Sequence, residues 1–138
     1  MNQWRAPEEM ASLLDGERSE HHLTNKIDIY ALGNIFFRMI VGKDVWRSND
    51  DKHKGKKATI GDANIIRKKI NGQNPPIPRG LLDSEKPGIV AIREVMLDCF
   101  LFKPERRPTA QSIVQRLEES LLQYKKRMKK KSRFRDKL

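Results

Sequence analysis

Residues 25–42 read Asn-Lys-Ile-Asp-Ile-Tyr-Ala-Leu-Gly-Asn-Ile-Phe-Phe-Arg-Met-Ile-Val-Gly. From residue 27 to residue 41, all but four of the residues are apolar. A surface helix shows an apolar stripe, whereas a helix that is apolar nearly all round is buried. The run is too long for an ordinary strand, and too short and too polar to span a bilayer. This stretch therefore predicts a buried central helix over about residues 26–41, on which the rest of the chain packs.

Both ends of this central helix carry recognisable signals. Asn25 is a suitable N-cap, and Asp28 follows three residues later, where a carboxylate faces unpaired backbone N–H groups. Gly42 supplies a stop at the other end. From the residues alone, Asp28 is either part of the cap or a buried anchor for another segment.

Further segments on both sides also have helical signals. Pro7 stands at the start of one helix, and Gly72 follows the end of another. The alternating pattern of a strand does not rise above noise, so the predicted fold class is all-α. The helices are expected over residues 8–14, from Asp62 to Asn71, from Pro87 to before Lys103, and from Thr109 onwards.

The charge is concentrated at the C-terminal end. The chain has 138 residues, enough for one domain with a modest core, and a formal net charge of +11. Residues 125–137 contain nine Lys or Arg and one Asp, a net charge of +8, which leaves +3 for the rest. The sequence therefore predicts a nearly neutral body with a basic tail.

The cysteine and histidine content argues against a disulfide framework and a metal site. Cys99 is the only cysteine and lies in an apolar helical run, where we expect a buried, unreactive thiol. His21 and His22 have no further ligand at suitable spacing, so a solvated loop is favoured over a metal site. We find no secretory signal pattern and no segment of transmembrane length. These features favour a reducing, intracellular setting, either cytoplasmic or nuclear.

Three motifs follow one another in an order known from one family. They are Trp-Arg-Ala-Pro-Glu at residues 4–8, Asp-Ile-Tyr-Ala-Leu-Gly at residues 28–33, and Cys-Phe-Leu-Phe-Lys-Pro-Glu-Arg-Arg-Pro-Thr at residues 99–109. Together they resemble the C-terminal lobe of a eukaryotic protein kinase domain, in which Ala-Pro-Glu closes the activation segment. The resemblance implies a partial kinase domain at residues 1–122, followed by a basic tail, helical or disordered, at residues 123–138.

The resemblance also implies roles for individual residues. Glu8 and Arg107 would form a buried ion pair, because a planar guanidinium can hold a carboxylate through two hydrogen bonds. Asp28 would anchor the catalytic loop by accepting hydrogen bonds from its backbone. Trp4 and Arg5 would face the protein substrate, next to the residue that follows the phosphorylated one.

The segments that hold ATP and Mg²⁺ in this family have no counterpart in the sequence. There is no Gly-rich phosphate loop, no strand lysine, no His-Arg-Asp catalytic loop and no Asp-Phe-Gly metal ligand. We therefore expect no catalytic residue, no cofactor-binding residue and no metal ligand in this chain. The chain alone is predicted to be inactive, and ATP and Mg²⁺ would be bound by a complete parent domain.

Three functions are compatible with these observations. The favoured one is part of a protein kinase that phosphorylates protein hydroxyls, with Ser/Thr favoured over Tyr. Its partner would be a protein substrate or the missing N-terminal part of the kinase domain. The second is a lobe-only, non-catalytic scaffold, and the third is a basic helical protein that binds nucleic acid or membrane. The tail at residues 125–137 is either a solvated helix end or a site for nucleic acid, anionic lipid or an import receptor.

Overall fold

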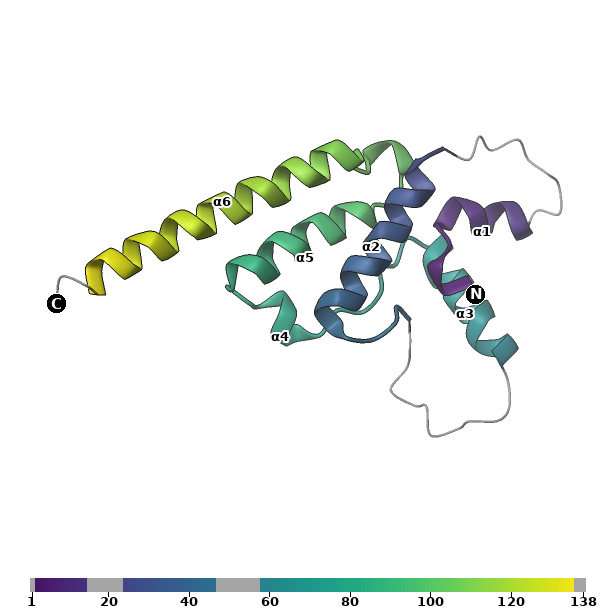
Figure 1. Cartoon of the computed structure of the whole chain (residues 1–138). Helices are drawn as coiled ribbons and strands as arrows, with labels where there is room; N and C mark the ends of the chain where they lie inside the picture. The colour runs from purple at the N-terminus through teal and green to yellow at the C-terminus, as the bar shows by residue number, and fades with distance from the viewer. Residues whose placement is uncertain (1, 15–23, 47–57, 136–138) are drawn as a thin grey trace.

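The structure, a computed structural model, describes residues 2–14, 24–46 and 58–135. These ranges contain helices and turns but no strand, so the all-α prediction is confirmed (Figure 1). His21 and His22 lie outside them. In chain order the elements are the short turn η1 (Asn2–Trp4), α1 (Pro7–Leu14), α2 (Lys26–Val41), α3 (Ala58–Ile70), α4 (Arg79–Leu82), α5 (Pro87–Cys99), the short turn η2 (Pro104–Arg106) and α6 (Ala110–Arg135).

Helix α2 occupies the centre of the arrangement, as its sequence predicts. It packs along α5, which packs along α6, while α1 and α3 lie together on the other side of α2 (Figure 1). Ile29, Tyr30, Phe36 and Phe37 of α2 are buried in the core. Burying a side chain of this size contributes roughly 1.5–3 kcal/mol before conformational entropy is counted. This burial explains why the other helices gather around α2.

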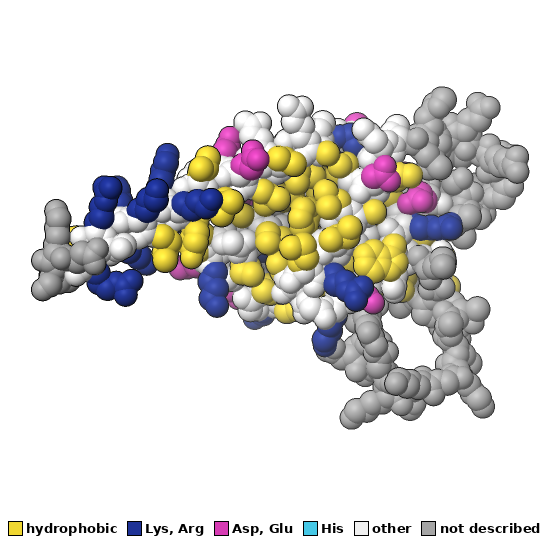
Figure 2. Space-filling view, in the orientation of Figure 1, with side chains coloured by type: hydrophobic (Ala, Val, Ile, Leu, Met, Phe, Trp, Pro, Cys, Tyr) yellow, Lys and Arg dark blue, Asp and Glu magenta, His cyan; other side chains and the backbone are white. Residues whose placement is uncertain are grey.

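The burial of α2, which its sequence predicts, does not extend to one face of the helix. Ile35 is 51% exposed and Met39 is 64% exposed. They lie four residues apart, one helical turn, so both side chains project from the same side of α2. Figure 2 shows hydrophobic side chains gathered over the middle of the molecule, where α2, α5 and α6 meet. An exposed apolar surface on a central helix marks a place where another structure can pack.

Gly33 allows α2 and α5 to approach each other closely. A Cβ at this position would lie 2.8 Å from the Cβ of Cys99 and 3.0 Å from the ring of Phe100. Any side chain would therefore push the two helices apart. The glycine in the middle of the apolar run is explained by this crossing.

The ends of the helices differ in part from the predictions. Gly42 has a left-handed φ of 75° and its N–H bonds to the carbonyl of Arg38, as a C-terminal stop requires. Asn25 does not cap α2 with its side chain. Instead, the hydroxyl of Thr24 accepts a hydrogen bond from the N–H of Lys26 at 3.3 Å. Helix α3 begins at Ala58, so Asp62 lies inside this helix and not at its cap.

Helix α6 begins after Thr109, whose hydroxyl accepts a hydrogen bond from the N–H of Ser112 at 3.1 Å. The helix then continues to Arg135 and is about 39 Å long, twice the length of α5. Its C-terminal part therefore extends past the other helices (Figure 1). The basic residues from 125 to 135 lie in this extension, and every one of them is exposed. Among the described helices, none is both long and apolar enough to cross a membrane.

Candidate functional site

The side chain of Arg107 is completely buried and ties distant parts of the chain together. Its Nη1 lies 2.6 Å from Oε1 of Glu8, and its Nη2 lies 2.8 Å from Oε2 of the same carboxylate. The structure thus brings together the two residues for which the sequence predicts an ion pair. Two parallel charge-assisted hydrogen bonds fix the relative orientation of the two side chains as well as their distance.

The remaining donors of Arg107 bond to backbone carbonyls. Nε donates to Leu101 at 2.8 Å, Nη1 donates to Lys26 at 2.9 Å, and Nη2 donates to Phe102 at 3.3 Å. With the two bonds to Glu8, all five N–H groups of the guanidinium have acceptors. A buried charge that is paired and fully hydrogen-bonded avoids the cost of a stranded ion. Arg107 therefore joins the start of α1, the start of α2 and the end of α5.

The side chain of Lys26 in turn bonds to the backbone at Arg107. Its ammonium donates to the carbonyl of Arg107 at 2.7 Å and to that of Pro108 at 3.1 Å. Tyr30, one turn further along α2, lies under the guanidinium, with 5.1 Å from its ring centroid to Cζ of Arg107. Burial raises the pKa of Tyr30 well above its usual value, despite the opposing effect of Arg107, so the phenol stays neutral.

Lys69, at the end of α3, holds the N-terminal turn in place. Its ammonium donates to the carbonyls of Asn2, Gln3 and Arg5 at 3.0, 2.6 and 2.6 Å. The side chain is buried, and burial lowers its pKa to about 8, with a partial opposing effect from Glu9. The three carbonyls take up all three N–H donors of the ammonium. Lys69 therefore fixes the backbone of residues 2–5 against α3.

Asn34 holds the same segment from the side of α2. It is fully buried, and its Nδ2 donates to the carbonyl of Trp4 at 3.0 Å. Sequence reasoning did not identify Asn34 or Lys69 as site residues. Both carried a signal: Asn34 is a polar residue inside an apolar run, and Lys69 lies at helical spacing from Ile65 and Ile66.

Two of the predicted site residues lie at the surface of this segment. Arg5 is exposed and Trp4 is partly exposed, while the backbone that carries them is held by Lys69 and Asn34. Asp28 is exposed in the first turn of α2. The structure therefore places Trp4 and Arg5 in the N-terminal segment and Asp28 at the start of α2.

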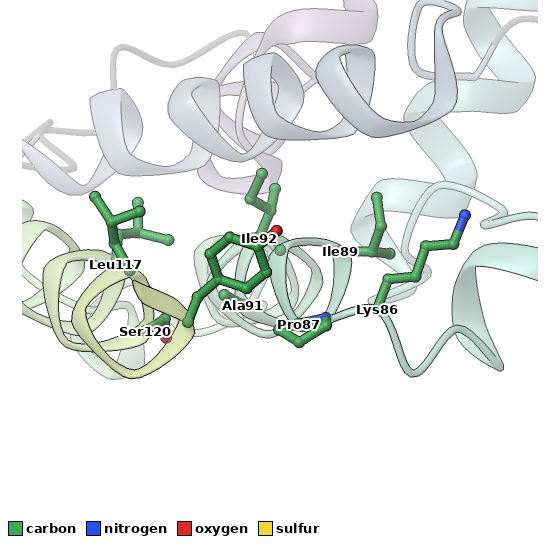
Figure 3. A pocket seen from close by; sticks show the side chains of 10 residues that line it. Lys86, Pro87, Ile89, Ala91, Ile92, Leu117 and Ser120 are labelled. Carbon is green, nitrogen blue, oxygen red and sulfur yellow. The ribbon is translucent and has the colours of Figure 1, made fainter. Parts of the chain in front are cut away.

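A cavity of about 740 Å³ lies between α5 and α6. In Figure 3, Leu117 of α6 and Ile92 and Ile89 of α5 lie in a row, with Lys86 at one end. Leu121 and Tyr124 extend the lining along α6, and Ser120 is its only hydroxyl besides that of Tyr124. Lys86 and Tyr124 are the only titratable side chains in its lining, so this cavity is suited to binding apolar side chains.

The acidic, histidine and cysteine side chains of the described residues form no metal-binding group. No group of three or more His, Cys, Asp or Glu side chains in these ranges could hold a metal ion. Cys99 is buried, as predicted, and burial raises the pKa of its thiol to about 11, with a smaller effect in the same direction from Asp98. A thiol with so high a pKa is a poor nucleophile near neutral pH.

Comparison with known proteins identifies the family to which this chain is similar. A family model described as "Protein kinase domain" matches residues 1–117. A mitogen-activated protein kinase kinase kinase of Pyricularia oryzae is 32% identical over 111 residues, and so is one of Cytospora mali. The matched part is 80% of this chain in both cases. It is 6% of the length of the first relative and 5% of the second.

Proposed function

This chain belongs to the protein kinase family, and from that premise we propose that it supplies the helical lobe of a kinase that phosphorylates Ser or Thr of proteins. The observation that carries the proposal is the ion pair between Glu8 and the buried Arg107. It fastens the segment that ends in Ala-Pro-Glu to the helical core, next to α2. This ion pair would hold the residues just before Glu8 in a fixed position relative to a bound substrate.

Trp4 and Arg5 are the residues that we propose to face the protein substrate. Lys69 and Asn34 bind the backbone on which these two side chains sit, and they do so from α3 and α2. A loop fixed from two helices presents its exposed side chains in one geometry. This arrangement supports substrate positioning, because phosphoryl transfer depends mainly on positioning and on charge stabilisation.

The exposed apolar face is the second element of the proposal. Ile35 and Met39 of α2 are exposed, and the cavity between α5 and α6 is lined by apolar side chains. We propose that another part of the kinase domain packs on this face and carries the groups that bind ATP and Mg²⁺. Asp28 would then bond to the backbone of the catalytic loop. In this proposal the helical lobe supports the catalytic loop, and the reacting groups come from the other part of the domain.

A chimeric kinase tests this function. Residues 1–122 replace the matching segment in the kinase domain of the Pyricularia oryzae relative, and transfer of labelled phosphate from ATP to a protein substrate is measured. We expect the chimera to be active, with label on Ser or Thr, and Arg5→Ala to raise KM for the protein substrate more than KM for ATP. The chain alone should transfer no phosphate.

Two outcomes would contradict the proposal. One is an inactive chimera whose helical content and thermal stability equal those of the parent kinase domain, which would favour a lobe-only scaffold. The other is ATP-dependent transfer by the 138-residue chain alone.

Asp28→Asn serves as the matched variant for the catalytic-loop contact, because it keeps the size of the side chain. It should lower kcat of the chimera and leave the stability of the isolated chain unchanged.

A further inference from the structure

The C-terminal end of α6 forms an exposed, strongly basic arm, which we define as residues 125–135. Eight of its eleven residues are Lys or Arg, and none is acidic. All of them are exposed. In Figure 1 this end of α6 projects beyond α5, and in Figure 2 Lys and Arg side chains lie along both edges of the projection. The protein kinase assignment, which matches residues 1–117, does not account for this arm.

The basic residues lie all around the arm, which also carries one apolar stripe. At 3.6 residues per turn, Leu117, Leu121, Tyr124 and Met128 fall on one narrow stripe. The first three of them line the cavity between α5 and α6, so the stripe faces the same side as that cavity. Arg135, seven residues after Met128, also falls on this stripe, and the other Lys and Arg side chains are distributed around the rest of the helix. Arg127 lines a small pocket together with Glu85 and Glu94. A ligand of the arm therefore meets a cylinder of positive charge.

The density of this charge matches that of a nucleic acid duplex. The eleven residues of the arm span about 16 Å, which gives roughly one positive charge per 2 Å. Double-stranded DNA carries about one negative charge per 1.7 Å of its axis. We propose that the arm binds the phosphate backbone of double-stranded nucleic acid without reading its sequence. This inference goes beyond the proposed kinase function and does not rest on it.

The shape of the arm favours a duplex over a membrane. A helix that lies on a bilayer needs a broad apolar face to insert and keeps its charges on the opposite face. In the arm the charges occupy most of the circumference, and Phe134 is the only apolar residue away from the stripe. The major groove of B-form DNA admits a helix and flanks it with phosphates on both sides. A planar lipid surface would reach the charges on one side only.

The composition of the arm, in which Lys outnumbers Arg, explains why we propose no sequence preference. The arm contains no Asn or Gln, the residues that bind adenine through two hydrogen bonds. Lys residues, which bind phosphate as point charges, make up five of its eleven positions. Binding would then be driven mainly by the release of counterions from the duplex, and its affinity would fall steeply as salt is added.

Fluorescence anisotropy of labelled 24-base-pair DNA duplexes tests this inference on the whole 138-residue chain. Two duplexes of unrelated sequence should bind equally, and log K should fall against log salt with a slope of about −4 to −7. The test variant changes Lys126, Lys129, Lys130 and Arg133 to Gln, which keeps good helix propensity. We expect at least a tenfold loss of affinity at 50 mM salt and a slope shallower by about 3 to 4.

A matched control separates the arm from the general charge of the protein. Arg67, Lys68, Lys103 and Arg106 are exposed residues outside the arm, and changing all four to Gln removes the same charge. This variant should keep the affinity within about threefold. An equal loss in both variants would overturn the proposal. Tighter binding to vesicles containing anionic lipid than to the duplexes would overturn it as well, in favour of a membrane, and so would the absence of duplex binding at 50 mM salt.

Discussion

Arg107 and Glu8, which are 99 positions apart in the chain, share two hydrogen bonds of 2.6 and 2.8 Å. The guanidinium is fully buried, whereas the carboxylate is 21% exposed. Removing Glu8 leaves a fully buried cation without its counterion, whereas removing Arg107 leaves a partly exposed carboxylate, which is the less unfavourable state. This relationship links the first helix to the turn before the last one and gives the first prediction.

Glu8→Ala should lower the free energy of unfolding by about 3–5 kcal/mol, because it leaves the fully buried guanidinium without its counterion. Arg107→Ala should also be destabilising, because it removes the bonds to the carbonyls of Lys26, Leu101 and Phe102 as well as the ion pair. The double variant should cost clearly less than the sum of the two, since both changes remove one interaction. Urea unfolding of the four proteins measures this coupling. Additive effects would show that the pair does not act as a unit. Arg107→Lys should rescue little, because an ammonium cannot hold the carboxylate bidentately.

Gly33→Ala should be destabilising, by about 1–3 kcal/mol. The added Cβ would lie 2.8 Å from the Cβ of Cys99 and 3.0 Å from the Phe100 ring, which are packed in the core. Gly88→Ala in α5 is the matched control, because no atom lies within 4 Å of its added Cβ. This control should be neutral or slightly stabilising, as alanine favours helix. Thermal unfolding decides the question, and equal midpoints for the two variants would contradict the close crossing of α2 and α5.

The lowered pKa of Lys69 should make the stability of the folded chain depend on pH. Its pKa in the folded chain, about 8, is below its ordinary value of 10.5. Between these two pH values the unfolded chain keeps a proton that the folded chain has lost, so stability rises with pH across this window. Lys69→Met should lack this rise, whereas Lys68→Met, at an exposed position, should keep it. Chemical unfolding at pH 7.5, 9 and 10.5 makes the comparison. Parallel pH profiles for Lys69→Met and wild type would refute the assignment.

The thiol of Cys99 should resist modification in the folded chain. With a pKa of about 11, only about one thiol in a thousand is ionised at pH 8, and the side chain is also buried. A chromogenic disulfide reagent should react slowly with the native protein, and quickly and stoichiometrically in urea. Fast reaction without denaturant would mean that the contact between α2 and α5 opens readily in solution.

The central helix could be predicted from the sequence because its signal is local. The apolar run sets the extent of α2, and Gly42 sets its end through a left-handed φ of 75°. The cap was less predictable, since Thr24 and Asn25 are adjacent and both types of side chain cap helices. In the structure Asn25 holds the N-cap position without a side-chain bond, and the hydroxyl of Thr24 accepts from the N–H of Lys26.

The binding partners of Lys69 could not be predicted from local sequence. It lies in a run of basic residues, where most side chains are solvated, and its acceptors are the carbonyls of Asn2, Gln3 and Arg5 at the other end of the chain. Only the fold brings these groups together. The exposure of Ile35 and Met39 could not be predicted from local sequence either. Their apolar character predicts burial, but no described residue of this chain covers them.

The face formed by Ile35 and Met39 allows the most direct test of the central claim, that this chain is a kinase lobe on which the rest of a kinase domain packs. The double variant Ile35→Glu, Met39→Glu is compared with Leu122→Glu, which changes an exposed leucine on α6 outside the cavity. In the isolated chain both variants should unfold within about 0.5 kcal/mol per substitution of the wild type, because all three residues are largely exposed. In the chimeric kinase, phosphate transfer should be retained by Leu122→Glu and reduced at least a hundredfold by Ile35→Glu, Met39→Glu. A double variant as active as the unmodified chimera would contradict the account.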